Sequence, residues 1–332
     1  MTQLFIGCDM SKHFFDVTYR DKAGHYIYLG QFINEATGFK ELVKQLKSVS
    51  KLPKSQWFVC FENTGSYSKA LFKFFCEKSI PRREEIAAQI SKSLGIKRGK
   101  NDKVDSKDIC KYLYQRRDTI RPNVLDDSQI SQLKKLLSYR DQLVKYKVGL
   151  SVGLKDINPN LEKDFVTELQ GLNNPLIKKL KKSIKDVESK IAKLIASDEE
   201  LNQTNKLVTS VVGIGHITSA YMIAYSDNFK AFFDPRKFAC YAGIAPFENS
   251  SGLFKGKNKV SNIANKKIKS ILSQCAMSAV LNDPQISAYY NRKKGQNKHY
   301  GIVMNAVKNK LVQRVFAVVK RKSPYLKLQA YA

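Results

Sequence analysis

Acidic residues are scarce in this chain of 332 residues, which has 29 Asp and Glu against 58 Lys and Arg and a formal net charge of +29. An imbalance of this size argues against an ordinary neutral metabolic enzyme, because the excess positive charge calls for a polyanionic partner, most commonly a nucleic-acid backbone. Long apolar runs are missing as well. None reaches the roughly 18 residues of a membrane span, and the first residues, MTQLFIGCDM, do not form a signal peptide. We therefore expect a soluble, cytoplasmic protein with no membrane partner.

The six cysteines have no CxxC pair and no Cys/His spacing of the kind that binds zinc. Reduced and mostly buried thiols are therefore expected. A hydrophobic fraction of 43% is enough to form buried cores and excludes a disordered basic tail. The length suggests about two folded units.

The first third of the chain is patterned as an α/β domain. β-rich runs are expected at Leu4–Cys8, His13–Tyr19, Tyr26–Ile33 and Trp57–Phe61. Helices are expected at Thr37–Val49, Ser66–Lys78, Ile86–Leu94 and Val104–Arg117. This order favours an RNase H-like sheet over a Rossmann unit, because Asp9-Met10-Ser11-Lys12 stands where a Gly-rich turn would follow the first strand.

The middle of the chain, from Ser128 to about Ala196, has almost no β signal. Its apolar residues follow a heptad seam, Leu176, Leu180, Ile184, Val187, Ile191 and Leu194. Lysines lie mostly off that seam, at Lys178, Lys179, Lys181 and Lys182. Two interpretations are open: a coiled-coil arm for dimerisation with a basic face for nucleic acid, which we favour, or a helical hairpin packed on its own domain with solvated lysines.

The last third is helical with glycine-rich interruptions. Val211–Ala220 (VVGIGHITSA) has two glycines before a helix, as in a helix-hairpin-helix turn that holds a phosphate, although a plain helix–turn–helix connection has the same pattern. Ile302–Val319 is expected to be a basic amphipathic helix. A lysine patch that could neutralise several phosphates consists of Lys255, Lys257, Lys259, Lys266, Lys267 and Lys269. Ser250 and Ser251 precede a glycine in this region; taken alone, a Ser-Ser-Gly is more often a turn than a nucleophile.

Four carboxylates are placed where they can converge. Asp9 ends the first expected strand and Glu62 follows Trp57–Phe61, while Asp102 and Asp105 lie three apart on one face of a helix start. Oxygen ligands in this arrangement suit a pair of hard divalent cations at a phosphodiester. Each acid has a simpler alternative, such as a turn cap for Asp9, a lysine partner for Glu62 and a helix cap for Asp102. Their joint placement in so basic a chain favours metal binding.

The motifs GCDMSKHFFDV, FENTGSY, NDKVDS, VVGIG and FACYAGIAPFENSSG…NKVSNIAN, in this order, resemble those of insertion-sequence 110 family transposases, to which Piv-type DNA invertases are similar. The resemblance implies an RNase H-like (RuvC-like) DEDD domain over residues 1–125, a helical coiled-coil region over 126–204 and a mainly helical transposase domain over 205–332. It also implies that Asp9, Glu62, Asp102 and Asp105 hold magnesium, or manganese in its place. Ser251, with Ser250 beside it, corresponds to the serine that attacks DNA and forms a phosphoserine link.

The same resemblance implies partners: the DNA of element ends and target, a structured noncoding guide RNA, and a homodimer that assembles into a tetramer in the bacterial cytoplasm, associated with the nucleoid. Four positions depart from the family pattern. Asn101 replaces the Thr of a KTD motif, Val212 replaces the Pro of a PGIG turn, and Asn258 and Ala264 stand where glycines are usual. None of them removes an expected metal ligand or the serine, so an active DNA transposase or recombinase is expected.

Two other functions fit the charge. The first is a metal-dependent, structure-specific nuclease that uses water and forms no covalent intermediate. The second is a nucleic-acid-binding regulator with degenerate acids, which would be indifferent to Asp9→Ala. The intact acidic tetrad argues against the regulator, and the last third of the chain, which a simple junction nuclease does not need, argues for the recombinase.

Overall fold

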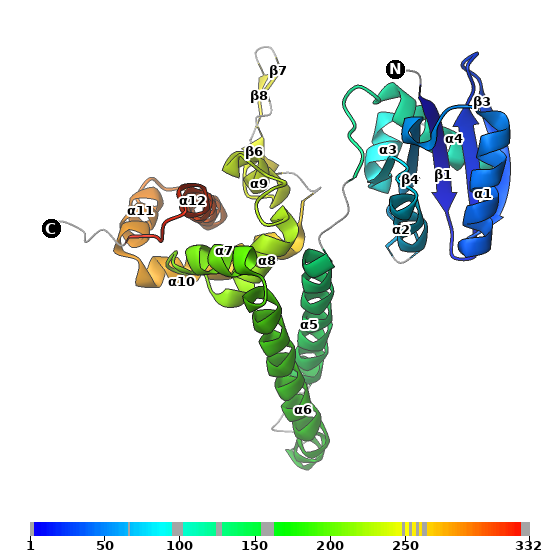
Figure 1. The fold of residues 1–332 in the computed structure, drawn as a ribbon. Coiled ribbons are helices and arrows are strands. Elements are labelled where there is room, and N and C mark those ends of the chain that lie inside the picture. The colour runs from blue at the N-terminus through cyan, green and yellow to red at the C-terminus, as the bar shows by residue number, and fades with distance from the viewer. Residues whose placement is uncertain are drawn as a thin grey trace. The chain divides into compact units, whose positions relative to one another are not determined.

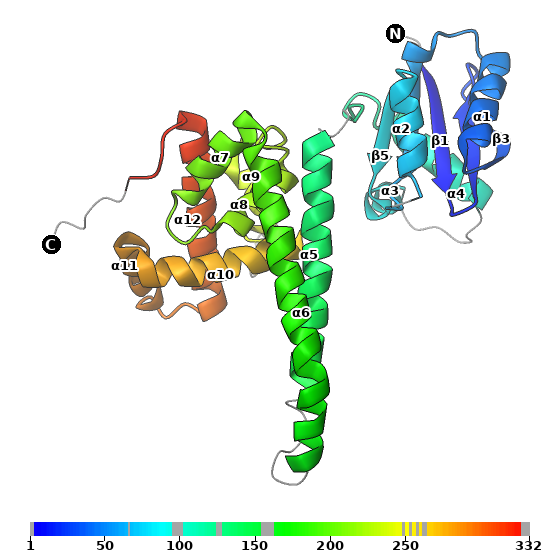
Figure 2. The ribbon, with the colours of Figure 1, turned by 60° about the horizontal axis from the view of Figure 1, so that its bottom comes forward.

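The computed structural model describes residues 3–65, 67–94, 102–123, 128–153, 163–247, 250–251, 254–256, 259–260 and 264–326. The chain divides into two compact units, Met1–Leu125 and Asp126–Ala332. The first unit is α/β and the second is mainly helical, as expected from the sequence (Figures 1 and 2). The further division of the second unit at residue 204 stays a prediction.

The first unit is built on one mixed five-stranded sheet with the order β3-β2-β1-β4-β5. Its strands are β1 (Leu4–Met10), β2 (Phe14–Arg20), β3 (Tyr26–Ile33), β4 (Trp57–Glu62) and β5 (Arg82–Glu85). Its helices are α1 (Ala36–Val49), the short η1 (Lys54–Gln56), α2 (Lys69–Glu77), α3 (Ala87–Ser93) and α4 (Asp102–Gln115). β1, β2 and β3 form an antiparallel meander, and β4 and β5 run parallel to β1.

Side-chain alternation along β1 and β4 divides the apolar residues of this unit between two cores. The even-numbered residues of β1, such as Ile6, join the core under α1 and α2, with Phe61 of β4 on the same side. Phe5 and Cys60 point to the other core, which α4 covers with Ile109. The sheet therefore lies between α1 and α2 on one face and α4 on the other (Figure 1).

The strand β5 has no counterpart among the expected elements. Its residues, RREE, contain no apolar side chain and so give no alternation signal. It forms because its backbone continues the parallel ladder of β4, with Phe61 opposite Glu84 and Glu62 opposite Glu85. Tertiary pairing here overrides a low strand propensity.

The second unit contains eight of the described helices around one hydrophobic core. They are α5 (Ser128–Gly153), α6 (Lys163–Ala196), α7 (Glu199–Thr209), α8 (His216–Ser226), α9 (Pro235–Tyr241), α10 (Lys266–Asn282), α11 (Pro284–Lys294) and α12 (Tyr300–Arg321). Two small antiparallel pairs interrupt them, β6 (Pro246–Phe247) with β9 (Lys259–Val260) and β7 (Ser250–Ser251) with β8 (Phe254–Lys255). The core runs from Ile130 in α5 to Val318 in α12, so residues on both sides of position 204 share it.

The heptad seam of the middle region has two different environments. Ile184, Val187 and Ile191 of α6 are buried in the core of their own unit, where α5 packs alongside as the second arm of a hairpin (Figure 2). An ion pair between Arg140 and Glu188, 2.7 Å long, joins the two arms. This part of the seam follows the hairpin interpretation, because its apolar surface is already covered within the chain.

The outer part of the hairpin exposes apolar side chains. Leu176 is 51% exposed and Leu172, one turn earlier, is 65% exposed. Across the hairpin, Tyr146 of α5 is 60% exposed. Exposed apolar area of this kind is typical of an association surface, and the dimer stays a prediction.

Within the part of the chain that the structure describes, no helix is long and apolar enough to cross a membrane. All six cysteines are free thiols, and four of them, Cys8, Cys60, Cys110 and Cys275, are buried. The expectation that the thiols are mostly buried is confirmed, and their reduced state stays a prediction.

Candidate nucleic-acid-processing site

Asp9 and Glu62 point to the same face of the sheet. β1 and β4 are adjacent and parallel, with Gly7 opposite Cys60 and Cys8 opposite Phe61. Cys8 and Phe61 belong to the core under α1 and α2, whereas Cys60 belongs to the core under α4. Since alternate residues of a strand face opposite sides, Asp9 and Glu62 both face α4. Each of the two carboxylates is half-buried.

A glycine brings α4 against this face. A Cβ atom on Gly7 would lie 2.3 Å from the backbone nitrogen of Cys110 and 2.4 Å from the carbonyl oxygen of Ser106, so only the bare backbone allows the approach. The Ser106 hydroxyl also shares a 2.8 Å hydrogen bond with the Thr18 hydroxyl of β2. The contact fixes the first turns of α4 over β1, two residues before Asp9 along the strand.

The expected helical acids lie at that end of α4. Asp102 is the first residue of the helix, and Asp105 is half-buried and directly precedes Ser106. The side chain of Asp102 lies outside the described residues. The structure thus brings Asp9, Glu62 and Asp105 to one side of the sheet.

The donor chemistry of this face fits a divalent cation. Carboxylate oxygens are the ligands that magnesium and manganese take, and the surrounding thiols are buried rather than offered as ligands. Among the side chains that the structure describes, no three acids, histidines or cysteines are spaced to hold a metal ion, and Asp102 is not among those side chains. The assignment of Asp9, Glu62, Asp102 and Asp105 as metal ligands stays a prediction.

Two further acids on this unit have structural partners. Asp16 lies directly opposite Asp9 in the β1–β2 register, but it is buried and accepts hydrogen bonds from the Tyr28 hydroxyl (2.5 Å) and the Gln31 amide (3.1 Å). Both of its carboxylate oxygens are therefore engaged. These contacts indicate a structural role for Asp16.

Sequence reasoning missed Glu85, which is opposite Glu62 at the end of β5. Its carboxylate is buried, pairs with the Arg83 guanidinium at 3.1 Å and accepts a hydrogen bond from the Tyr112 hydroxyl at 3.1 Å. Burial and this carboxylate raise the pKa of Tyr112 to about 12, so the phenol stays protonated as a donor. The only sequence signal was a pair of glutamates after a pair of arginines, without the apolar alternation that identifies a strand.

The thiols near this face are not nucleophiles. Burial raises the pKa of Cys110 to about 12 and also raises the pKa of Cys8 and Cys60 well above the ordinary value. A thiol that stays protonated at neutral pH is a poor nucleophile and a poor metal ligand. The candidate metal-binding groups on this face are therefore carboxylate oxygens.

The candidate nucleophile lies in the second unit, in a small hairpin. Ser250 pairs with Lys255 and Ser251 pairs with Phe254 across β7 and β8. This hairpin was expected only as a turn, because strands of two residues are too short to show alternation. The side chains of both serines lie outside the described residues.

The glycine turn of the second unit connects α7 to α8, so VVGIG is a helix–turn–helix connection. Gly213 has a φ of +90°, and a Cβ atom there would lie 2.7 Å from the carbonyl oxygen of Cys275, so the turn requires glycine. Gly215 is the N-cap of α8. The N-terminal end of this helix packs against α10 through the contact of Thr218 with the Cys275 thiol (3.2 Å). The phosphate-binding interpretation of the turn stays a prediction.

The expected lysine patch is divided among several environments. Lys255 and Lys259 are described only in their backbone, and Lys257 lies outside the described residues. Lys267 pairs with Asp141 of α5 at 2.6 Å, so its charge is already partly neutralised. Lys266 is exposed at the start of α10, and Lys269 follows on the same helix.

Comparisons with known proteins agree with this arrangement of motifs. A model of DEDD transposases of the IS110 type matches residues 6–156, and a model of the transposase IS116/IS110/IS902 family matches residues 205–291. The pilin gene-inverting proteins of Moraxella bovis and Moraxella lacunata are each 25% identical over 98% of both chains. A putative transposase of Sinorhizobium fredii (strain NBRC 101917 / NGR234) is 23% identical over 56% of this chain and 52% of its own. The chain belongs to the IS110 family of transposases and related DNA invertases.

Proposed function

We propose that the protein is a DNA recombinase that cleaves, exchanges and rejoins DNA strands through a phosphoserine intermediate, with a divalent metal at an RNase H-like acidic site. The observation that carries the proposal is the placement of Asp9 and Glu62 on the face of the sheet that α4 covers, with Asp105 at the near end of that helix. The strand order β3-β2-β1-β4-β5, with three antiparallel strands followed by two parallel ones, supports the RNase H-like assignment.

The proposed metal ligands are Asp9, Glu62, Asp102 and Asp105, and magnesium is the proposed ion, with manganese as the alternative. When bound, such an ion supplies charge stabilisation at the phosphodiester and lowers the pKa of a hydroxyl that it contacts. The protein's own residues hold it: buried strand backbones fix Asp9 and Glu62, and Gly7 lets α4 approach them.

Ser251 is the proposed nucleophile, with Ser250 as the neighbour to be distinguished from it. Its Oγ would form a bond to phosphorus while the bond from phosphorus to a deoxyribose oxygen breaks, and that oxygen would take up the proton lost by the serine. The phosphoserine ester keeps the energy of the phosphodiester, so a free deoxyribose hydroxyl of another strand can reverse the reaction and rejoin DNA. A nuclease that used water would cut without being able to reseal.

The basic surface of the second unit supports nucleic-acid partners. A cavity of about 610 Å³ on the α5–α6 hairpin is lined by Arg140 and by five lysines, Lys147, Lys178, Lys181, Lys182 and Lys185, against one acid, Glu188. Together with the lysine patch of residues 255–269, this surface would neutralise phosphates of DNA and of a structured guide RNA. The DNA sequence would then be selected by base pairing with the guide RNA.

Self-association is part of the proposal. The exposed apolar side chains of the outer hairpin, Leu172, Leu176 and Tyr146, would form the dimer contact, and two dimers would assemble on the DNA ends and target. A shared site, with the serine of one chain serving the acids of another, is compatible with such an assembly.

A covalent-adduct experiment tests the function. Purified protein with its copurifying RNA is mixed with end-labelled element-junction DNA and magnesium, and then denatured. We expect labelled DNA linked to protein, and we expect the adduct to disappear in Ser251→Ala and Asp9→Ala while Ser250→Ala retains it. Cleaved DNA without any adduct would identify a water-using nuclease, and an adduct lost in Ser250→Ala but kept in Ser251→Ala would move the nucleophile by one residue.

A further inference from the structure

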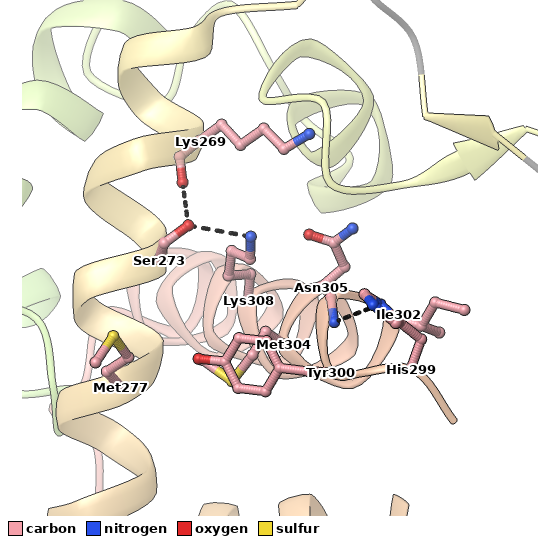
Figure 3. A pocket seen from close by; sticks show the side chains of 10 residues that line it. Lys269, Ser273, Met277, His299, Tyr300, Ile302, Met304, Asn305 and Lys308 are labelled. Carbon is pink, nitrogen blue, oxygen red and sulfur yellow. Dashed lines mark hydrogen bonds between the residues drawn. The ribbon is translucent and has the colours of Figure 1, made fainter. Parts of the chain in front are cut away.

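A cavity of about 360 Å³ lies between α10 and α12, outside the acidic face and the serine hairpin. Figure 3 shows that side chains from both helices reach it: Lys269 and Ser273 from α10, and Asn305 and Lys308 from α12. His299, which precedes α12, lines the same cavity. Of these five residues only Lys269 belongs to the lysine patch expected from the sequence.

Lys308 is the unusual member, because lysine is rarely buried without a partner of opposite charge. It is 6% exposed, and its ammonium donates one hydrogen bond to the Ser273 hydroxyl at 3.1 Å. That hydroxyl in turn donates to the backbone carbonyl of Lys269 at 2.9 Å, so its lone pair is presented to Lys308. Ser273 therefore positions the ammonium, and within the described parts of the chain no other acceptor takes its two remaining hydrogens.

No Asp or Glu is among the described residues that line the cavity around Lys308. Neither α10 nor α12 contains an Asp or a Glu. Burial lowers the pKa of Lys308, and the neighbouring charge of Lys269 lowers it further. Two ammonium groups that face one cavity without an acid are unfavourable by themselves, and an anion between them would offset that cost.

The other groups at the cavity are also suited to an anion. His299 caps the 22-residue helix α12, and its Nδ1 accepts a hydrogen bond from the Gly301 backbone N–H at 3.2 Å. The acceptor role of Nδ1 places the imidazole proton on Nε2, which makes the ring a donor. The positive end of the α12 dipole lies at the same place. The side-chain amide of Asn305 extends beside Lys308 (Figure 3).

We infer that this cavity binds a phosphodiester group of a nucleic-acid backbone, held by Lys308 and Lys269, with Ser273 positioning Lys308. The identification of the anion as part of a nucleic acid rests on the proposed function; the anion selectivity rests on the cavity alone. The ligand chemistry is shared by DNA and RNA, because the groups that line the cavity recognise the phosphate and leave the bases unread. The site would anchor the nucleic-acid backbone on the helical unit.

A matched pair of variants on one helix tests the site. Lys308→Met removes the buried charge, and Lys310→Met removes an equal charge from an exposed position of α12, where Lys310 lies 4.6 Å from the ring centre of Tyr289. Binding of full-length protein to a fluorescein-labelled 20-bp DNA duplex and to a labelled RNA hairpin is followed by anisotropy over a range of salt concentrations. We expect Lys308→Met to weaken binding of at least one of the two probes about ten-fold and to reduce the salt slope by about one, and Lys310→Met to change binding less than two-fold.

Further variants separate binding from folding. Lys269→Met changes a half-buried residue at the cavity and is expected to reproduce most of the loss, and Ser273→Ala a smaller part of it, with unchanged thermal melting. A response to the DNA probe alone assigns the phosphate to DNA, and a response to the RNA probe alone assigns it to RNA; either outcome supports the site. Equal losses in Lys308→Met and Lys310→Met, or wild-type binding of both probes by Lys308→Met and Lys269→Met, would overturn it.

The adduct assay on the wild-type protein keeps the two proposals distinct. If Lys308→Met weakens binding but the wild-type protein forms no adduct, the phosphate site is supported and the phosphoserine mechanism is contradicted. An adduct in the wild type with no binding defect in Lys308→Met or Lys269→Met would do the opposite.

Discussion

The two units of this chain differ in the number and distribution of their charged residues. Residues 1–125 contain 23 Lys and Arg and 13 Asp and Glu, a net charge of +10, whereas residues 126–332 contain 35 and 16, a net charge of +19. From residue 249 to the end, the single acid is Asp283, which pairs with Arg314 at 2.7 Å. The first unit thus places candidate acids on one face of a sheet, whereas α10 and α12 of the second unit contain none.

The net charge of a unit and the local charge at its candidate site are therefore separate properties. A phosphodiester is attracted by the field of the whole protein, whereas a metal ion needs local carboxylates, which by themselves repel the phosphates of DNA. Buried strands give the acids fixed positions, so few are needed. The helical unit attracts phosphate through many lysines and one buried ammonium, Lys308.

The largest expected difference is between variants of Asp9 and Asp16, which are register partners in the β1–β2 pair. Asp9→Asn should reduce DNA cleavage in magnesium about a thousand-fold, a loss of about 4 kcal/mol in transition-state stabilisation, because the carboxylate is a proposed metal ligand. Asp16→Asn, its neighbour in the register, should cleave within a few-fold of wild type, since both Asp16 oxygens accept structural hydrogen bonds. Single-turnover cleavage of labelled DNA measures both variants.

The thermal stability of the two variants is the control for that comparison. Asp16→Asn should melt at a lower temperature by the loss of about one hydrogen bond, or about 1 kcal/mol, and Asp9→Asn should melt near wild type. If Asp16→Asn were as inactive as Asp9→Asn, the metal would be held by the strand pair instead of by β1, β4 and α4.

The second comparison divides the heptad seam at its change of environment. Ile191→Asp places an unpaired charge in the core of the second unit and should unfold it, at a cost of several kcal/mol. Leu176→Asp changes a residue that is 51% exposed and should leave folding intact while weakening self-association. Sedimentation equilibrium and far-UV circular dichroism distinguish the two results. Unchanged self-association in a double variant, Leu172→Asp with Leu176→Asp, would remove the outer hairpin as the dimer contact.

The third comparison contrasts two glycines. Gly7→Ala forces α4 away from β1, because its new Cβ would meet backbone atoms at 2.3 and 2.4 Å, and should destabilise the first unit by about 3 kcal/mol. Gly149→Ala in α5 meets nothing within 4 Å and should stabilise the second unit by about 0.5–1 kcal/mol. Trp57 is the single tryptophan and is fully buried in the first unit, so its fluorescence reports that unit alone in urea.

Cleavage activity adds a second readout to the glycine pair. If the approach of α4 assembles the acids, Gly7→Ala should lose activity even under conditions where Trp57 fluorescence remains native. Wild-type cleavage by a folded Gly7→Ala protein would mean that the position of α4 over β1 does not matter to the site.

The alternating strands and long helices are predictable from sequence because each buries an apolar face of its own. Strand runs such as Leu4–Met10 and helices such as Tyr300–Arg321 differ from the expected ranges by only a few residues at their ends. The positions of Asp9 and Glu62 at strand ends were predictable for the same reason, since a carboxylate at the end of an apolar run is conspicuous. The strand Arg82–Glu85 was not, because its pairing depends on a neighbouring backbone.

The second unit shows what a single sequence does not reveal. An apolar seam has the same period whether its partner is the same chain or another, so Ile184 and Leu176 were indistinguishable before their burial was known. The burial of Lys308 could not be predicted from the sequence for a related reason. It lies within a helix of mixed basic and apolar residues, and only the packing of α10 against α12 shows that its charge is enclosed.

A pH dependence of stability is also expected, and it belongs mainly to the first unit. Burial raises the pKa of Cys8, Cys60 and Cys110, and for Cys110 to about 12 from 9.0, so the folded state keeps these thiols protonated where the unfolded chain would ionise them. Their contribution to stability is complete below pH 9 and is lost as pH rises from there toward the folded pKa, because the unfolded state then binds fewer protons. At pH 10 the unfolding free energy should have fallen by about 1 kcal/mol for each thiol. Urea titrations followed by Trp57 fluorescence at pH 7, 9 and 10 measure this slope, and a Cys110→Ala variant should lose about a third of it; an unchanged slope in that variant would mean that other groups carry the pH dependence.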